Sequence, residues 1–125
     1  MSFFRSLMGG GVPAVTVQQA SEMQGQDGVG ALIVDVREPN EYTQLRARGA
    51  VLLPLGRLNG RVKDLPRDRE LLLMCRTGGR SQNATQFLQA QGFSNVTNVS
   101  GGIVAWHAAG LPTTSGEPEP GEGEF

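Results

Sequence analysis

The chain has 125 residues, which is enough for one compact domain and too short for two. Of these residues, 38% are hydrophobic and 18% are charged, a composition typical of a soluble protein. Its single cysteine excludes a disulfide within the chain, so nothing indicates an oxidising compartment, and we expect a cytoplasmic protein. The net charge is −1 at pH 7, but four glutamates lie after Leu111, and the remainder has eleven basic and eight acidic side chains, a net charge of +3.

Several classes of protein are disfavoured by these properties. The basic excess is too small, and the sequence too poor in aromatic residues, to indicate nucleic-acid binding. No apolar run approaches the length of a membrane-spanning helix, and residues 1–11 lack the leading basic region and continuous apolar core of a secretory signal. We therefore expect neither nucleic acid nor membrane as a partner. The basic excess can steer small anions, and is equally typical of a solvated face.

The first part of the chain predicts a flexible arm and then the start of a domain. Residues 1–13 contain three successive glycines and indicate the arm. Residues 14–17 predict a short strand. Thr16 and Gln19 fit the capping box of a helix over residues 17–23.

The next apolar run ends with charged residues. Residues 32–36, LIVDV, suit a buried strand of a parallel sheet, and Arg37 follows them. A carboxylate at the end of an apolar strand is unfavourable unless it is paired, so we expect Asp35 to accept hydrogen bonds from neighbouring loop amides or from an arginine. We favour a structural bond between two loops over a direct part in catalysis.

Shorter elements are expected between this strand and the cysteine. They are a helical turn over residues 39–44, a strand over 50–53 and a helix over 55–63. Tyr42 is expected to face inward. Leu58 and Val62, four residues apart, are expected to face the core.

The candidate site begins where the apolar run of residues 71–74 stops at Cys75. The run predicts a strand buried on both faces, with the cysteine at its carboxyl end. Gly78 and Gly79 permit positive φ, and residues 81–91 predict a helix. Backbone N–H groups at such a turn, with the positive end of the helix dipole, form a site for an anion.

A cysteine in that position is expected to form a thiolate more readily than a free one, with Arg76 and Arg80 adding positive charge. The commoner fate of a lone cysteine is to be a small buried hydrophobe. A core cysteine needs neither the glycine pair nor two arginines, so we favour a nucleophile. For Arg80 alone, a solvated position in the first helical turn is almost as well supported.

The last part of the chain predicts a strand, a helix and a tail. Residues 95–99 suit a short strand. The segment GGIVAW, residues 101–106, predicts a tight turn followed by a helix whose Trp106 packs on the core. His107 is expected to be exposed or structural; a Cys-His pair is a minority possibility, and one histidine with one cysteine predicts no metal site. Residues 113–125, rich in Gly, Pro and Glu, predict a disordered acidic tail.

Three motifs together resemble a known family. CRTGGRS, residues 75–81, looks like the active-site loop of the rhodanese family of sulfurtransferases, which begins with a catalytic cysteine and closes on an arginine followed by Ser or Thr. DVREPNEY, residues 35–42, is similar to the family's D-V-R-x-x-x-E-[YF] segment, and GGIVAW to its G-G-x-x-x-W signature. The resemblance spans roughly residues 14–112. It departs at LRARGA, residues 45–50, where many members have G-H-I-P-G-A, which leaves the roles of Arg46 and Arg48 open.

The resemblance implies an α/β fold of rhodanese type, a mainly parallel central sheet flanked by helices. It implies that Cys75 is catalytic and that its loop holds the outer sulfur of a persulfide. The expected binding residues are Arg76, Thr77, Gly78, Gly79, Arg80 and Ser81. Asp35 and Arg37 would border the same mouth, with Arg37 either supporting the loop or contacting substrate. No cofactor is expected.

Our leading hypothesis is a sulfurtransferase that moves sulfur from a small anionic donor, such as thiosulfate or a persulfide, to cyanide or a thiol. The second is a persulfide carrier that delivers sulfur to a partner protein. The third is a phosphatase or arsenate reductase of the same fold. The active-site loops of the related phosphatases are one residue longer. The six-residue loop from Cys75 to Arg80 suits a single sulfur atom instead. A silent interaction module is disfavoured by the cysteine.

Overall fold

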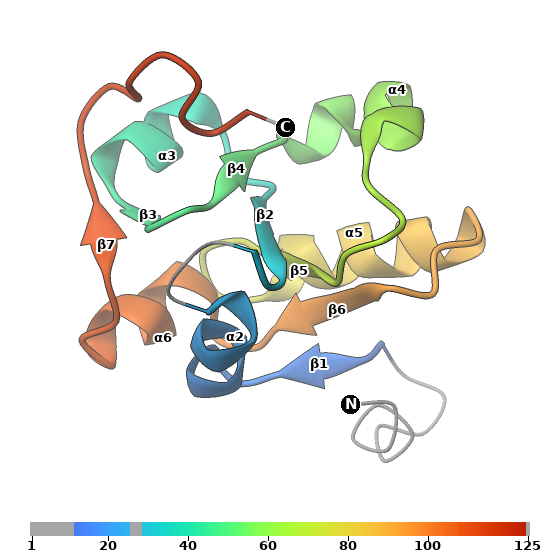
Figure 1. Cartoon of the computed structure of the whole chain (residues 1–125), viewed down its shortest axis with the longest axis horizontal. Coiled ribbons are helices and arrows are strands. Elements are labelled where there is room, and N and C mark those ends of the chain that lie inside the picture. The colour runs from blue at the N-terminus through green and yellow to red at the C-terminus, as the bar shows by residue number, and fades with distance from the viewer. Residues whose placement is uncertain (1–11, 26–28, 125) are drawn as a thin grey trace.

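A computed structural model of the protein describes residues 12–25 and 29–124 (Figure 1). The predicted flexible arm lies almost entirely outside these residues. The helices and strands follow in the order β1 (Ala14–Val15), α2 (Val17–Gln24), β2 (Leu32–Asp35), α3 (Pro39–Gln44), β3 (Arg46–Ala47), β4 (Val51–Leu52), α4 (Leu58–Arg61), β5 (Leu71–Met74), α5 (Gly79–Ala90), β6 (Val96–Val99), α6 (Gly102–Ala108) and β7 (Thr113–Thr114).

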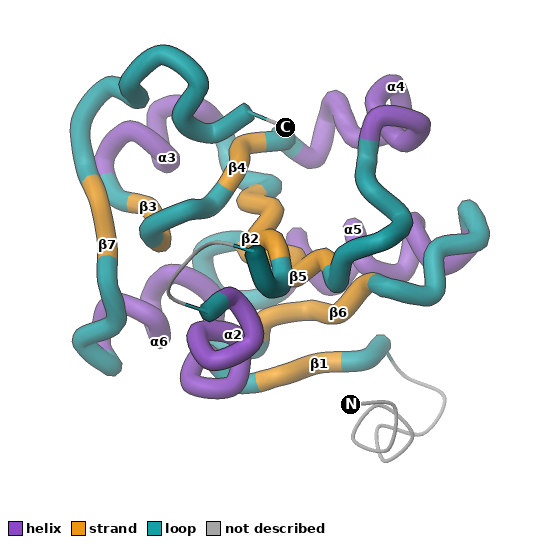
Figure 2. Tube along the Cα trace, in the orientation of Figure 1, coloured by secondary structure: helices purple, strands orange, loops and turns teal. Residues whose placement is uncertain are grey.

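Five strands form the central sheet, in the order β1-β6-β5-β2-β4, and all four pairings are parallel. This arrangement confirms the mainly parallel sheet expected from the sequence. β5 is the middle strand, and its four residues, Leu71–Met74, are 0% exposed. In Figure 2 the strands form a layer with helices on both sides. The carboxyl end of β5 is therefore bordered by β2 and β6.

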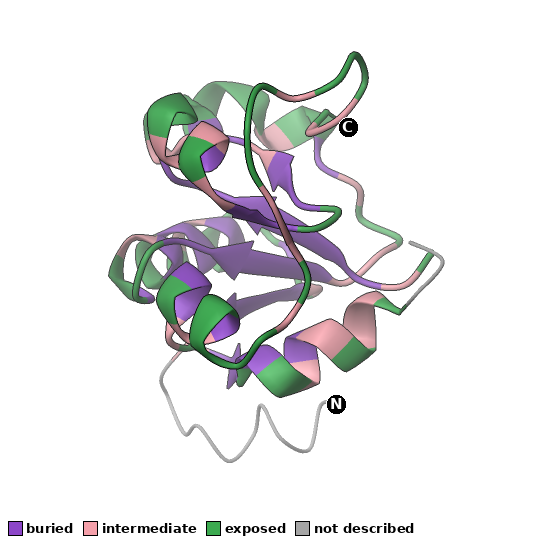
Figure 3. Cartoon of the chain, turned by 90° about the vertical axis from the view of Figure 1, so that its left-hand side faces the viewer, coloured by how far each residue is buried: buried purple, intermediate pink, exposed green. Residues whose placement is uncertain are grey.

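Alternate residues of β5 supply two separate apolar cores. Leu71, Leu73 and Cys75 pack with residues of α4 and α5 on one face, and Leu72 and Met74 pack with residues of α2, α3 and α6 on the other. Figure 3 shows the buried strands between these helices. The period of two thus points Cys75 towards the face covered by α5.

Local signals in the sequence locate most elements correctly. The capping box is present, with the Thr16 hydroxyl accepting from Gln19 N and Gln19 Oε1 accepting from Thr16 N. The continuous helix expected over residues 55–63 is wrong. That segment is a 3-10 turn, one turn of α4 and a second 3-10 turn. Gly56 and Gly60 lie within it, and glycine disfavours a regular helix.

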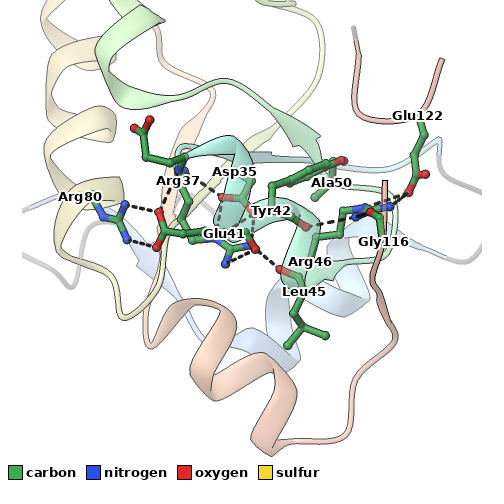
Figure 4. A network of polar contacts seen from close by, with 11 residues as sticks. Asp35, Arg37, Glu41, Tyr42, Leu45, Arg46, Ala50, Arg80, Gly116 and Glu122 are labelled. Carbon is green, nitrogen blue, oxygen red and sulfur yellow. Dashed lines mark hydrogen bonds and ion pairs between the residues drawn. The ribbon is translucent and has the colours of Figure 1, made fainter. Parts of the chain in front are cut away.

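The structure departs from the expectation of a disordered tail. β7 pairs antiparallel with β3, and Leu52 N donates to the carbonyl of Gly123 at 2.9 Å. Arg46, only 1% exposed, donates to Gly116 O at 2.8 Å and pairs with Glu122 at 3.0 Å (Figure 4). A buried guanidinium needs acceptors, and tail atoms supply them.

Among the described residues, no helix is both long and apolar enough to span a bilayer.

The Arg46–Glu122 contact predicts that one tail glutamate supports the fold. Glu122→Gln should lower the free energy of unfolding by roughly 1 kcal/mol, because a buried guanidinium loses its carboxylate. Urea unfolding measures this change. Glu117→Gln alters an exposed glutamate of the same tail and should stay within about 0.5 kcal/mol of the parent. Equal stability of the two variants would show that the Glu122 carboxylate does not stabilise the fold through Arg46.

Candidate active site

Cys75 lies directly after β5, with its sulfur facing the start of α5. The residue is 1% exposed, and Sγ accepts a hydrogen bond from Gly78 N at 3.1 Å. The Ser81 hydroxyl lies 3.3 Å from the same sulfur. Gly78 precedes α5 with φ of 116°, a conformation that favours glycine, and this turn aims its N–H at the sulfur. The sulfur is buried, and the loop donors point towards it.

Two opposing effects set the pKa of Cys75. Burial raises it, because a thiolate is less well solvated there than in water. Hydrogen bonds from the Ser81 hydroxyl and from the N–H groups of Ser81, Gly78 and Thr77 lower it. The hydrogen bonds outweigh burial, so the pKa of Cys75 lies below the ordinary value of a thiol. Such a site favours a nucleophilic thiolate.

Helix α6 holds the other side of the loop. Ile103 N donates to Cys75 O at 2.9 Å, and Val104 N donates to Arg76 O at 3.1 Å. This contact requires Gly102, since a Cβ there would overlap both carbonyls and its φ is +57°. With these two carbonyls engaged by α6, the peptide planes of the loop are fixed. The GGIVAW motif therefore supports the cysteine loop as well as packing Trp106.

Asp35 and Arg37 form a buried pair beside the loop (Figure 4). Asp35 accepts from Arg37 N at 3.0 Å and from Arg37 Nη2 at 2.8 Å, as expected for a carboxylate that ends an apolar strand. Arg37 also donates to Glu41 O at 3.3 Å and Leu45 O at 2.6 Å. These bonds link the end of β2 to Glu41 within α3 and to Leu45 at its C-cap, so the geometry of Arg37 is that of a support.

Arg80 has a partner that the sequence did not reveal. Its Nη1 and Nη2 donate to the two carboxylate oxygens of Glu41, at 2.8 and 2.9 Å. The pair joins the first turn of α5 to α3 and neutralises the positive charge expected near the sulfur. The guanidinium of Arg80 is thus paired, although its side chain remains 37% exposed.

Arg76 is the exposed cation of the loop. It lines a pocket of about 280 Å³ between the loop, α3 and α6, together with Arg37, Glu41, Gln44, Leu45, Ile103, Val104 and His107. The Arg37 and Glu41 charges in this lining are already paired with Asp35 and Arg80. Among the described residues, Arg76 has no ion pair, and it leaves the pocket with a net positive charge. His107 is exposed at its edge.

The structure brings together all the predicted loop residues and places Asp35 and Arg37 nearby. Sequence reasoning missed Glu41, whose partner is 39 residues away, and Asn98, a buried residue of β6 that contacts Ser81. A polar residue at an inward position of a buried strand is the signal that could have identified Asn98. Within the described part of the chain, no three His, Cys, Asp or Glu residues gather as a metal site.

Comparison with known proteins identifies the family. The model of the rhodanese-like domain matches residues 16–109. A protein named sulfurtransferase from Allochromatium vinosum is 40% identical over 86 residues, which cover 69% of this chain and 80% of that protein. The crystal structure of a rhodanese-related protein from Thermoplasma volcanium has a TM-score of 0.72 at 29% identity, and the match covers 82% of this chain and 97% of that one. The chain belongs to the rhodanese-like domain family.

A further match is to part of a much longer protein. "Probable adenylyltransferase/sulfurtransferase MoeZ" of Mycobacterium tuberculosis is 40% identical over 76 residues, which cover 59% of this chain. The match spans 19% of the length of MoeZ.

The Arg80–Glu41 pair predicts a pH dependence of stability. The hydrogen bond from Arg80 is the main reason that the pKa of Glu41 falls to about 2 from 4.5, against the smaller effect of burial. Because the folded pKa is the lower one, this contribution to stability is present above pH 4.5 and is lost as the pH falls towards 2.

Glu41→Gln should therefore lower the free energy of unfolding by about 0.5–1 kcal/mol at neutral pH, and the difference from the parent should shrink towards pH 2. Urea unfolding at several pH values measures it. Asp64→Asn is the control, since the Arg61–Asp64 pair is 45% and 43% exposed. A difference for Glu41→Gln that is independent of pH would contradict the pairing.

Proposed function

We propose that this protein is a sulfurtransferase that carries a sulfane sulfur as a persulfide on Cys75. The family match and the relatives named sulfurtransferase support a sulfurtransferase role in general. The observation that carries the mechanism is the set of loop donors around Sγ, because they stabilise the thiolate in a buried position.

In the first step the Cys75 thiolate attacks the outer sulfur of a donor such as thiosulfate. A bond forms between Sγ and that sulfur, the sulfur–sulfur bond of the donor breaks, and its electron pair leaves with sulfite. The product is a Cys75 persulfide. Loop N–H groups from Arg76 to Ser81 hold the negative charge on the outer sulfur.

In the second step a thiophilic acceptor, cyanide or a thiolate, attacks the outer sulfur. The new bond to the acceptor forms, and the electron pair of the persulfide bond returns to Sγ. The products are the Cys75 thiolate and either thiocyanate or a persulfide of the acceptor. A low pKa makes Cys75 a better leaving group in this step.

Arg76 supplies the charge that attracts an anionic donor. Arg80 is less suited to this role, because its guanidinium is already paired with the Glu41 carboxylate. Arg76 stands at the pocket beside the loop, and it immediately follows the nucleophile in sequence. An exposed guanidinium there raises the local concentration of thiosulfate.

A second candidate is a persulfide carrier that passes its sulfur to a partner protein. The observation that favours it is the match to MoeZ, whose name combines adenylyltransferase and sulfurtransferase. The matched segment spans 19% of the length of MoeZ. Slow thiosulfate:cyanide exchange with fast transfer to a protein thiol would indicate the carrier. A phosphatase or arsenate reductase is disfavoured by the six-residue loop, and failure to hydrolyse an aryl phosphate would set it aside.

Intact-mass spectrometry after incubation with thiosulfate tests the proposal. We expect a gain of one sulfur atom that peptide mapping assigns to Cys75, reverses on addition of cyanide, and is absent in Cys75→Ser. A protein that remains unmodified, or whose Cys75→Ser variant gains the same mass, would overturn the persulfide mechanism.

Arg76→Ala should weaken the use of thiosulfate. We expect KM for thiosulfate to rise roughly two- to fivefold with little change in kcat, because an exposed attractive charge is lost while the loop N–H groups remain. The effect should shrink at high salt. Arg48→Ala is the matched control, since Arg48 is exposed and lines a different pocket with Ser21 and Pro112. An equal rise in KM for both variants would remove Arg76 from donor binding.

A further inference from the structure

Asn98 occupies an apolar position of the sheet next to the cysteine. It lies on β6 opposite Leu73 of β5, so its side chain shares the face of Leu73 and Cys75. Val96, two residues earlier, belongs to the apolar core on that face. Asn98 is 6% exposed. A buried amide needs hydrogen-bond partners, and the partners of Asn98 belong to the cysteine loop and to α5.

Both ends of the Asn98 amide are engaged. Nδ2 donates to Gly78 O at 3.4 Å, and Oδ1 accepts from the Ser81 hydroxyl at 2.6 Å. A backbone carbonyl can only accept, so the contact with Gly78 turns Nδ2 towards the loop and leaves Oδ1 for Ser81. Asn98 therefore acts on Ser81 as an acceptor.

Ser81 has one hydroxyl proton and more than one acceptor for it. Its Oγ lies 2.6 Å from Asn98 Oδ1, but 3.3 Å from Cys75 Sγ and 3.3 Å from Gly78 O. One O–H group makes one strong hydrogen bond at a time. A neutral thiol sulfur is a weak acceptor, so the 2.6 Å contact with Asn98 Oδ1 is the stronger one while the sulfur is neutral. A thiolate is the stronger acceptor, because hydrogen bonds to ionised groups are about twice as strong as neutral ones.

We propose that Asn98 is a positioning residue that holds the Ser81 hydroxyl while Sγ is neutral and gives it up when Sγ becomes an anion. Within the sulfur-transfer cycle this inference rests on the proposed function. In the persulfide, Sγ is bonded to the outer sulfur and Ser81 donates to Asn98. When an acceptor removes the outer sulfur, the electron pair returns to Sγ, and the hydroxyl rotates to donate to it. No proton leaves Ser81.

Removing the competing acceptor should make the thiolate easier to form. Asn98→Leu keeps a side chain of similar shape and frees the hydroxyl for Sγ. The pKa of Cys75, measured by the pH dependence of iodoacetamide alkylation, should fall by about half to one unit, which is the worth of one neutral hydrogen bond. Ser81→Ala should raise it.

The double variant gives the decisive comparison. In the Ser81→Ala background no hydroxyl remains to be shared, so adding Asn98→Leu should leave the pKa of Cys75 unchanged. A role confined to holding Gly78 in place would instead move the pKa equally in both backgrounds. The charged and titratable groups around the loop are unaltered in every variant: Asp35, Arg37, Glu41, Arg76, Arg80 and His107.

Asn98→Asp gives a second, opposite test that does not depend on the folding of the leucine variant. A carboxylate holds the Ser81 hydroxyl more tightly and adds negative charge near the sulfur, so the pKa of Cys75 should rise. An unchanged or raised pKa in Asn98→Leu, or an equal fall in the Ser81→Ala background, would overturn the inference. Alkylation needs no sulfur donor, so a failure of persulfide formation would reject the proposed function and leave this result readable.

Discussion

The convergence of loop hydrogen-bond donors on Sγ of Cys75 is the interaction on which the rest of the site depends. Burial alone would keep the sulfur protonated, because a buried charge is poorly solvated. The N–H groups oppose this effect only if the peptide planes are held. Gly78 provides the turn, and the contact of Gly102 with the carbonyls of Cys75 and Arg76 fixes the backbone behind it. Gly78 and Gly102, which are far apart in sequence, thus both help to orient the donors around Sγ.

Most of the charged side chains near the sulfur form ion pairs with one another. Asp35 pairs with Arg37 inside the protein, and Glu41 pairs with Arg80 across two helices. These pairs connect the elements around the loop, and they leave Arg76 to face incoming anions. Cys75 is 1% exposed while Arg76 is exposed, so in the proposed mechanism a donor meets the surface of the loop before it meets the sulfur. In that mechanism Arg76 attracts the donor and Cys75 reacts with it.

The sequence predicted the features that depend on neighbours in the chain. The apolar run before Cys75, the glycines after it and the capping box at Thr16 each follow from local backbone preferences. The partners of Arg80 and Arg46 lie 39 and 76 residues away, and only the folded chain brings them together. Asn98 was missed for the same reason, since only the pairing of β6 with β5 places this polar residue beside the loop. The tail contacts likewise depend on a buried arginine that composition cannot reveal.

The chemistry of the site depends on the loop holding the pKa of Cys75 below that of a free thiol. The ultraviolet absorbance of the parent protein, followed against pH after subtraction of that of Cys75→Ser, measures this pKa directly. We expect a single titration with a midpoint clearly below about 8.5, the value of a free cysteine. A midpoint at or above that value would mean that burial outweighs the loop donors, and the proposed chemistry would lose its physical basis.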